Sequence, residues 1–550
     1  MSRLAALLLL AVFAILCVHG LRWDTPTVDE FAHLPSGWYT LQTGRFDLFP
    51  LNPPLVKVLS ALPLLALNPR LDPAARIENT GWYPWLYATG FMERNRAEYD
   101  RIFLLGRLPV LALGLGLGWL VFRWARELYG DEAGLVALFL TVFFPSLIAH
   151  AHLATVDVGL CFFLLLALYL FWRFVQRPTP GMLIACGAAL GLAQLSKFTA
   201  LILYPVFLLL ALLPLSVGAG LAPAREGVNP SPTSRNRRLA SLALIFLISL
   251  IVLDAGYLFQ GIGRRAGDFR FESKLLSILP AALPMPLPAD YLEGLDALQL
   301  INDVGEYPEY LFGRWSREGS PAYYLVVILF KTPLPLLAAL LLAPFARREA
   351  KNQSFLWLPA LVLLAFFSTS KVHYGIRYVL PIFPLLFIYA SRLVPWLRTR
   401  GRALQIVALI LLLAYPVSAI VSTPDTISYF NVLAGGQGDR ILLDSNIDWG
   451  QGLKRVRAFM DREGIDRIGL AYFGHVDPAL YGIDWGFPRP DRPGLVAISA
   501  NFLHGYPYAT YAGGRMVPVP PDAFTWIAKL PRVADLGGGI FVYRIPERSQ

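Results

Sequence analysis

The sequence predicts an α-helical polytopic membrane protein that carries a small α/β domain at its C-terminal end. Three observations predict this fold class: an apolar composition, a recurrence of apolar segments of bilayer length, and a change of composition after Thr423. Of the 550 residues, 56% are hydrophobic and only 16% are charged, and the mean hydropathy is +0.52. A soluble globular chain carries about 25% charged residues. The composition therefore excludes the ordinary soluble classes.

Eleven apolar segments recur along the first 422 residues. Each is about long enough to span the hydrocarbon core of a bilayer, the shorter ones marginally. The segments are 4–21, 102–122, 133–149, 157–172, 182–196, 199–215, 239–260, 322–345, 354–369, 376–395 and 403–422. The two segments beside Lys197 can form one broken helix or two short ones. The first segment follows Arg3 and lacks a convincing cleavage site, so we expect an uncleaved helix rather than a signal peptide.

Basic residues are distributed between the loops as the positive-inside rule requires. With a cytoplasmic N-terminus, the arginine-containing loops 123–126, 173–177, 225–238, 347–351 and 392–402 face the cytoplasm. Eleven spans then leave the long loops 23–101 and 261–321, and the C-terminus, on the extracytoplasmic side. The net charge of +10 follows from this topology and does not indicate nucleic-acid binding. The preference for arginine over lysine indicates a bacterial inner (plasma) membrane, with a periplasmic outer face in a Gram-negative cell.

The composition changes at the end of the apolar segments, which divides the chain into a membrane part, 1–422, and a soluble part, 423–550. The soluble part contains acids, glycines and short β-like runs. We expect strands at 441–443, 467–473 and 495–499 and an amphipathic helix at 450–463. Strands that alternate with a helix predict a small α/β domain, and the topology places it outside the membrane.

An adjacent acid pair, Asp29 and Glu30, follows the first apolar segment directly. Carboxylates beside a membrane segment are costly unless a polar cavity or the water interface receives them. In a helix, Asp29 and His33 fall on one face, where a carboxylate with a nearby histidine can act as a general base or bind a divalent metal ion. No full ligand set such as HExxH accompanies them, so the metal stays an alternative. A solvated loop whose acids have no chemical role is another.

Two further groups of charged residues fall at the same predicted face. One consists of His150, His152 and Asp157, at the outer ends of the third and fourth segments; interfacial histidines and a helix N-cap are the structural alternative. The other consists of cations, since Arg binds phosphate bidentately and Lys binds it as a point charge. Its members, with one histidine in the same segment, are Lys197, Lys371, His373 and Arg377.

Carboxylates and cations at the outer mouths of membrane segments suit a substrate with a lipid tail and an anionic head. One acid would activate a nucleophile, and the cations would neutralise a phosphate leaving group. A transporter or flippase of a lipid-linked sugar could use the same residue types. However, transporters place charges near the bilayer midplane in repeated halves, and the sequence has no internal repeat. A non-catalytic envelope scaffold is a third alternative.

The stretches VDEFAHLPSGWYTLQTG and NPPLVKVLSALPLL resemble the first external loop of the protein O-mannosyltransferase and aminoarabinose transferase superfamily. TVD at 155–157, SK at 196–197 and IRYVLPIFP at 376–384 add to the resemblance, which covers roughly 1–420. The superfamily comprises glycosyltransferases of the GT-C fold that use polyprenyl-phosphate sugars. The resemblance therefore implies a membrane glycosyltransferase that transfers a sugar to a hydroxyl of a protein, lipid or glycan acceptor, with inversion.

The resemblance also implies roles for individual residues. Asp29 matches the acid taken as the catalytic base, with Glu30 as its neighbour, and Asp157 matches a second acid of the site. Lys197 and Arg377 match the groups that bind the lipid-linked phosphate, with Lys371 and His373 in the same region. A further set in the soluble part could contact sugar or acceptor, or could form a plain turn: Asp444, Asn446, Asp448 and Trp449.

Two departures from the family pattern concern the acceptor. The soluble part is not the carbohydrate-binding trefoil domain of eukaryotic protein mannosyltransferases, which puts a protein acceptor in doubt. Asn52 precedes Pro53 where the aminoarabinose enzymes have a lysine, which puts modification of lipid A in doubt.

Overall fold

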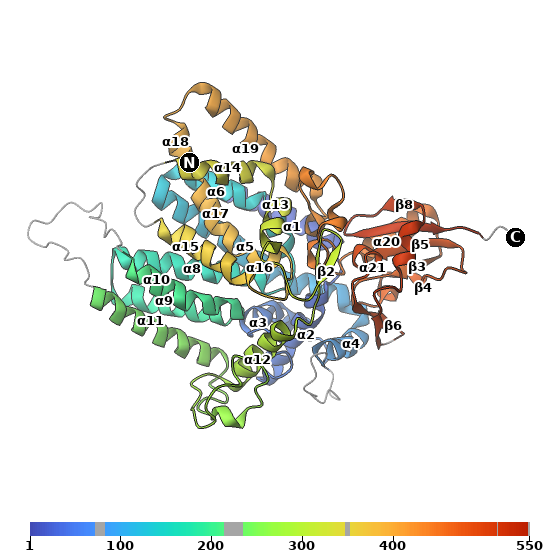
Figure 1. Cartoon of the computed structure of the whole chain (residues 1–550), viewed down its shortest axis with the longest axis horizontal. Coiled ribbons are helices and arrows are strands. Elements are labelled where there is room, and N and C mark those ends of the chain that lie inside the picture. The colour runs from blue at the N-terminus through green and yellow to red at the C-terminus, as the bar shows by residue number, and fades with distance from the viewer. Residues whose placement is uncertain (72–82, 214–234, 347–352, 514, 548–550) are drawn as a thin grey trace, which may run out of the picture.

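The computed structural model describes residues 1–71, 83–213, 235–346, 353–513 and 515–547. Most of the predicted cytoplasmic loop 225–238 and the loop 347–351 fall outside the described residues. In Figure 1, helices of the first 422 residues form one body, and the C-terminal strands form a sheet beside it. Strands of the C-terminal residues thus lie beside a mostly helical body.

Within the described residues, five helices are long and apolar enough to cross a membrane. They are α1 (Ser2–Trp23), α5 (Tyr99–Tyr129), α8 (Asp157–Gln176), α11 (Arg235–Gly256) and α19 (Arg402–Ser422). The number rises to seven if two bent pairs each form one span. These pairs are α6 (Asp131–Val142) with α7 (Pro145–Ala151), bent by 67°, and α13 (Tyr323–Lys331) with α14 (Leu334–Leu342), bent by 115°. These helices support an integral membrane protein.

The remaining apolar segments form shorter helices, so the prediction of eleven spans is not confirmed. They are α9 (Pro180–Gln194), α10 (Leu203–Leu212), α15 (Ser354–Ser368), α16 (Ile376–Val379), α17 (Ile382–Ala390) and α18 (Leu393–Leu397). Prolines account for the breaks in the bent pairs, because the residue before a proline is pushed out of the α conformation. Phe144 before Pro145 and Thr332 before Pro333 are extended.

The chain beside Lys197 forms two short helices rather than one broken helix. α9 ends at Gln194, Lys197 has extended backbone (φ −162°, ψ 144°), and the 3₁₀ helix η3 (Phe198–Ile202) leads into α10. Because of this break Lys197 belongs to no helix, and its side chain extends toward Asp157 of α8. Gln194 stabilises the break, because its Nε2 donates to the carbonyl of Ala200 at 2.8 Å.

The described residues of the first long loop include the α-helices α2 (Val28–Thr43), α3 (Leu55–Ala61) and α4 (Tyr83–Arg94). α2 begins with a capping box, in which Thr27 and Glu30 bond each other's backbone N–H. It ends at Gly44, whose φ of +67° is a left-handed conformation that favours glycine. The second long loop contains α12 (Ala289–Val304) and a hairpin of β1 (Glu309–Leu311) and β2 (Arg314–Ser316).

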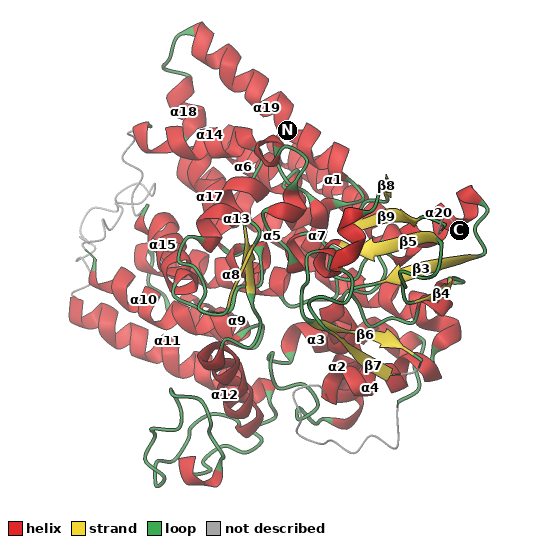
Figure 2. Ribbon diagram, turned by 45° about the vertical axis from the view of Figure 1, so that its right-hand side comes forward, coloured by secondary structure: helices red, strands yellow, loops and turns green. Residues whose placement is uncertain are grey.

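The C-terminal part contains a five-stranded mixed sheet in the order β4-β3-β5-β9-β8 (Figure 2). Its strands are β3 (Arg467–Ala471), β4 (Asp484–Gly486), β5 (Gly494–Ser499), β8 (Arg532–Asp535) and β9 (Ile540–Ile545). β3 pairs in parallel with β4 and β5, whereas β9 is antiparallel to β5 and β8. A separate hairpin is formed by β6 (Tyr508–Ala512) and β7 (Arg515–Val519).

The predicted elements of this part are found with one exception. The expected helix is α20 (Leu453–Glu463), and strands β3 and β5 coincide with two of the expected strands. The strand expected at 441–443 is wrong, since these residues lead into the 3₁₀ helix η9 (Asp444–Asn446). Asp444 has φ +58°, which is incompatible with a continuing strand.

The C-terminal part and the first long loop share a hydrophobic core. Phe31 and Leu34 of α2 belong to the same buried cluster as Leu453 of α20 and Leu470 of β3. A buried ionic network adds to this core, because Asp24 bonds both Nε2 of His152 and Nη2 of Arg455 at 2.9 Å. The C-terminal part is therefore held against the ends of α1 and α7, and the loops beside its sheet can contribute to a site there.

Candidate active site

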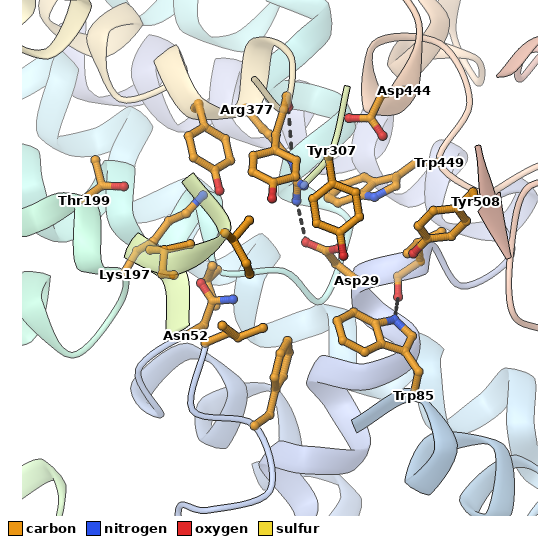
Figure 3. A pocket seen from close by; sticks show the side chains of 18 of the residues that line it. Asp29, Asn52, Trp85, Lys197, Thr199, Tyr307, Arg377, Asp444, Trp449 and Tyr508 are labelled. Carbon is orange, nitrogen blue, oxygen red and sulfur yellow. Dashed lines mark hydrogen bonds and ion pairs between the residues drawn. The ribbon is translucent and has the colours of Figure 1, made fainter. Parts of the chain in front are cut away.

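A cavity of about 940 Å³, including its open mouth, lies where α2, the break before η3, α16 and the C-terminal part meet (Figure 3). Its lining combines charged, amide and aromatic side chains. They include Asp29, Asn52, Trp85, Lys197, Tyr307, Tyr374, Arg377, Tyr378, Asp444, Trp449, Tyr506 and Tyr508. Residues separated by more than 400 positions in sequence thus face one space.

Asp29 and Arg377 form an ion pair in this cavity (Figure 3). Asp29 lies in the first turn of α2, and its side chain keeps 21% of its exposure, while that of Arg377 keeps 9%. Arg377 also donates from Nε to the carbonyl of Tyr374 at 3.2 Å and lies 4.3 Å from the ring centroid of Trp449. The guanidinium group is thus fixed between a carboxylate and an aromatic face. Asp29, whose side chain keeps part of its exposure, stays partly open to the cavity.

Asp157 and Lys197 form a second ion pair, in which Nζ of Lys197 lies 2.7 Å from Oδ1 of Asp157. The ammonium group also lies 4.1 Å from the ring centroid of Tyr378, a cation–π distance. Oδ2 of Asp157 has no hydrogen-bond partner among the described residues. Lys197 lines the cavity, whereas Asp157, which accepts a hydrogen bond from Lys197, is not part of the lining.

Glu30, the neighbour of Asp29, lies in a different environment. Its side chain is fully buried and pairs with Arg107 of α5, at 2.7 Å from Nε and 2.8 Å from Nη2. It also accepts from the backbone N–H groups of Thr27 at 3.0 Å and Ala154 at 2.7 Å. Glu30 therefore joins the start of α2 to α5 and to the turn before α8, and it does not face the cavity.

The predicted histidines lie around the cavity rather than in its lining. His33 lies beside it, with Nε2 3.4 Å from Nδ2 of Asn52, and burial lowers the pKa of His33 to about 4. His150 contacts Trp449 edge to face, with ring centroids 5.8 Å apart. His152 bonds Asp24, and His373 bonds Glu309 and stacks on Tyr323 with centroids 4.6 Å apart.

Lys371 is directed away from the other predicted cations. Its side chain is 41% exposed, and its Nζ lies 4.0 Å from Glu318 and 3.4 Å from the carbonyl of Asp303. The structure thus brings Asp29, Asp157, Lys197 and Arg377 together and places Lys371 outside their cavity. Among the described residues, no three His, Cys, Asp or Glu side chains are grouped so that they could hold a metal ion. Asp29 and His33 accordingly have no third side chain of these four types grouped with them in the described part of the chain.

Several residues of the site carry no motif in the sequence. Arg107, the partner of Glu30, lies inside an apolar helix. An arginine at such a position indicates that an acid from another part of the chain pairs with it, and this was the signal that the sequence offered. Two tyrosines from distant segments, Tyr307 in the second long loop and Tyr508 at the start of β6, reach the cavity together (Figure 3). Their segments, GEYPEY and HGYPYATY, are unusually rich in tyrosine, but only the fold brings them beside Asp29.

Residues 103–218 match the family model described as dolichyl-phosphate-mannose-protein mannosyltransferase. This match confirms the predicted resemblance to the protein O-mannosyltransferase superfamily. The matched segment contains Asp157 and Lys197, one of the two ion pairs of the cavity, and it supports a membrane glycosyltransferase. No curated protein matches the chain.

Solved structures of glycosyltransferases are similar to this chain at low identity. ArnT from Cupriavidus metallidurans bound to undecaprenyl phosphate is 14% identical over 98% of both chains, with a TM-score of 0.47. The Archaeoglobus fulgidus oligosaccharyltransferase in complex with Zn and sulfate is 13% identical over 76% of this chain and 53% of its own, with a TM-score of 0.43. The S. cerevisiae protein O-mannosyltransferase complex bound to the sugar donor is 18% identical over 47% of this chain and 33% of its own, with a TM-score of 0.33.

Proposed function

We propose that this protein is a membrane glycosyltransferase that transfers a sugar from a polyprenyl-phosphate donor to an acceptor hydroxyl, with inversion, on the extracytoplasmic face. The observation that carries the proposal is the cavity in which the carboxylate of Asp29 faces the same space as the cations Lys197 and Arg377. The match of residues 103–218 to the mannosyltransferase family supports a polyprenyl-phosphate donor.

Lys197 and Arg377 would bind the donor phosphate. Charge-assisted hydrogen bonds from ammonium and guanidinium groups are about twice as strong as neutral ones. The phosphate becomes the leaving group, so its negative charge grows as the bond to the sugar breaks. Cations fixed beside it before the reaction stabilise that charge without reorganisation. Asp157 fixes Lys197 at 2.7 Å, and Trp449 fixes Arg377 from its other face.

Asp29 would act as the general base. It accepts the proton of the acceptor hydroxyl as the acceptor oxygen bonds to the anomeric carbon and the bond from that carbon to the phosphate oxygen breaks. A single displacement in line inverts the configuration at that carbon. The ion pair with Arg377 orients the carboxylate, and its partial exposure leaves room for the hydroxyl. Glu30 contributes by fixing the first turn of α2, on which Asp29 lies.

The proposal is tested with the full chain purified into liposomes, with labelled polyprenyl-phosphate sugars and an envelope acceptor fraction. Wild type is compared with Asp29→Asn and with Glu98→Gln, an exposed acid of the same external loop. We expect label on the acceptor with wild type and Glu98→Gln but not with Asp29→Asn. Full transfer by Asp29→Asn would remove the base assignment. Label that crosses the bilayer without a new glycosidic bond would favour the flippase alternative.

A further inference from the structure

One end of the cavity is built almost entirely by the C-terminal part. In Figure 3, Lys197 and Thr199 lie at one end, Asp29 lies between, and Asp444, Trp449 and Tyr508 lie at the other. The first end is cationic, and the second end carries a carboxylate among aromatic rings. We refer to Asp444, Trp449 and Tyr508, together with Tyr307 beside them, as the aromatic end of the cavity.

Asp444 is held in an unusual conformation at this end. Its φ of +58° lies in the left-handed region, which few residues with a Cβ adopt, although aspartate and asparagine do so more often than the others. Its backbone N–H donates to Oδ1 of Asn501 at 2.8 Å, and the Ser445 hydroxyl donates to its Oδ2 at 3.1 Å. Such conformations cluster at binding sites, because they direct a side chain where a regular backbone would not.

The charges of the cavity single out Asp444 as the carboxylate with free capacity. Asp29 is paired with Arg377, and Asp157 is paired with Lys197. Asp444 forms no salt bridge with any residue of the described part, although it lines the same cavity. An ionised carboxylate accepts hydrogen bonds from about four directions. Among the described residues, Ser445 alone donates to it, from its backbone N–H and from its hydroxyl, which also donates to the carbonyl of Tyr374 at 2.9 Å. A ligand with hydroxyl groups would supply the remaining donors.

The direction of the proposed reaction assigns the two ends. In a single displacement the leaving phosphate and the incoming oxygen lie on opposite sides of the anomeric carbon. With the phosphate at Lys197 and the base at Asp29, the acceptor extends from Asp29 toward the aromatic end. Carboxylates accept from the hydroxyls of a sugar, and aromatic rings pack against its C–H faces. Of the described lining residues beside this end, Asp29 and Asp444 are carboxylates and Arg377 is the cation, so the net charge there is negative and disfavours an anionic acceptor.

We infer that the acceptor is a neutral carbohydrate and that Asp444 accepts hydrogen bonds from its hydroxyls, with Tyr307, Trp449 and Tyr508 around the ring. This inference rests on the proposed function and adds the class of acceptor to it. It assigns the C-terminal part a role in acceptor selection, whereas Lys197 and Arg377 of the membrane part would bind the donor phosphate.

The test uses the full chain in liposomes with a labelled polyprenyl-phosphate hexose. The acceptors are a panel of methyl hexosides and neutral hexose oligosaccharides, their monodeoxy analogues, and a Ser/Thr-containing peptide. Asp444→Asn is compared with wild type, because asparagine has the same shape and tolerates a positive φ but lacks the charge. The matched control is Asp491→Asn, an exposed aspartate of the same part that lies outside the cavity. Thermal unfolding of each variant is recorded alongside.

We expect wild type to glycosylate a neutral glycoside in preference to the peptide. Removal of the hydroxyl that contacts Asp444 should lower kcat/KM about tenfold in wild type and in Asp491→Asn, since hydrogen bonds to charged groups are the stronger ones. In Asp444→Asn the same removal should cost less than twofold. If Asp444→Asn does not fold, Tyr307→Ala, which removes the ring that packs against the sugar, should raise the acceptor KM at least threefold.

Two results would overturn the inference while the proposed function stands. One is equal sensitivity of wild type and Asp444→Asn to every deoxy acceptor. The other is release of labelled sugar to water or to the peptide, with no neutral glycoside accepted. A wild-type protein that neither transfers nor releases the sugar would instead overturn the proposed function, and the inference with it.

Discussion

The adjacent acids Asp29 and Glu30 should give opposite results when each is replaced by its amide. Glu30→Gln removes the charge from a side chain that is fully buried and that bonds Arg107, Thr27 and Ala154. The amide can neither neutralise the buried guanidinium nor offer two acceptor oxygens. Breaking one partner of a buried ion pair costs about 3–5 kcal/mol. At about 1.4 kcal/mol per tenfold, this is roughly a 100- to 4,000-fold loss in the folding equilibrium.

Asp29→Asn should have a small effect on stability. The Asp29 side chain is 21% exposed, and an asparagine oxygen can still accept from Arg377. We expect a loss of about 1 kcal/mol, because a partly exposed ion pair contributes little. Turnover should nevertheless fall by about 100-fold or more, since an amide cannot accept the proton that a general base removes.

The assay pairs two measurements on each variant in the same detergent or nanodisc. Unfolding is followed by thermal and denaturant titration, and transfer is normalised to the amount of folded protein. The double variant Glu30→Gln with Arg107→Gln should recover part of the lost stability, because no buried charge is then left unpaired. The reasoning would be refuted if Glu30→Gln unfolds like wild type but abolishes transfer, since Glu30 would then act in the chemistry.

Three further predictions follow from the ion pairs and buried groups. Lys197→Met should weaken the binding of polyprenyl phosphate about 10- to 100-fold, because a charge-assisted hydrogen bond is lost. Lys371→Met, which replaces the exposed lysine outside the cavity, should change this binding less than twofold. Equilibrium binding of the labelled lipid in nanodiscs distinguishes the two variants. Burial raises the pKa of Asp448 to about 7, so between about pH 4 and pH 7 the folded protein keeps a proton that the unfolded chain has lost. The free energy of unfolding therefore falls, by up to about 4 kcal/mol, as the pH rises through this range. Asp448→Asn should flatten the corresponding fall in melting temperature, and an unchanged pH profile would contradict the assignment. Lys331→Met should cost about 2–4 kcal/mol, because the buried carbonyls of Ile427 and Asn446 lose their donor at 2.7 and 2.6 Å; a melting temperature equal to that of wild type would show that another group replaces it.

The membrane part could be predicted well from the sequence because its signal is strong and local. Apolar runs between basic loops mark helices wherever they occur. The number of spans was harder to predict, because prolines and Lys197 divide runs of bilayer length into shorter or bent helices. Whether such a pair crosses the membrane once or not at all depends on packing against its neighbours.

The candidate site could be predicted where charge conflicts with an apolar surrounding. Asp29, Asp157, Lys197 and Arg377 stood out for that reason, and the structure brings all four together. The same reasoning grouped Glu30, Lys371 and His373 with them, since a sequence does not show which charges find partners elsewhere. Arg107, Asp303 and Glu309, which are remote in sequence, occupy these three groups.

The segment 444–449 links the aromatic end of the cavity to Arg377, so the C-terminal part cannot vary independently of this proposed phosphate-binding group. Asn446 is fully buried, and its Oδ1 accepts from the backbone N–H of Ile376, one residue before Arg377, at 3.1 Å. Lys331 donates to the carbonyl of the same Asn446. Asp444, two residues before Asn446, lines the aromatic end, and Trp449 packs on Arg377. A shift of this segment would therefore move Arg377 and Asp444 together, the proposed phosphate-binding and acceptor-binding groups.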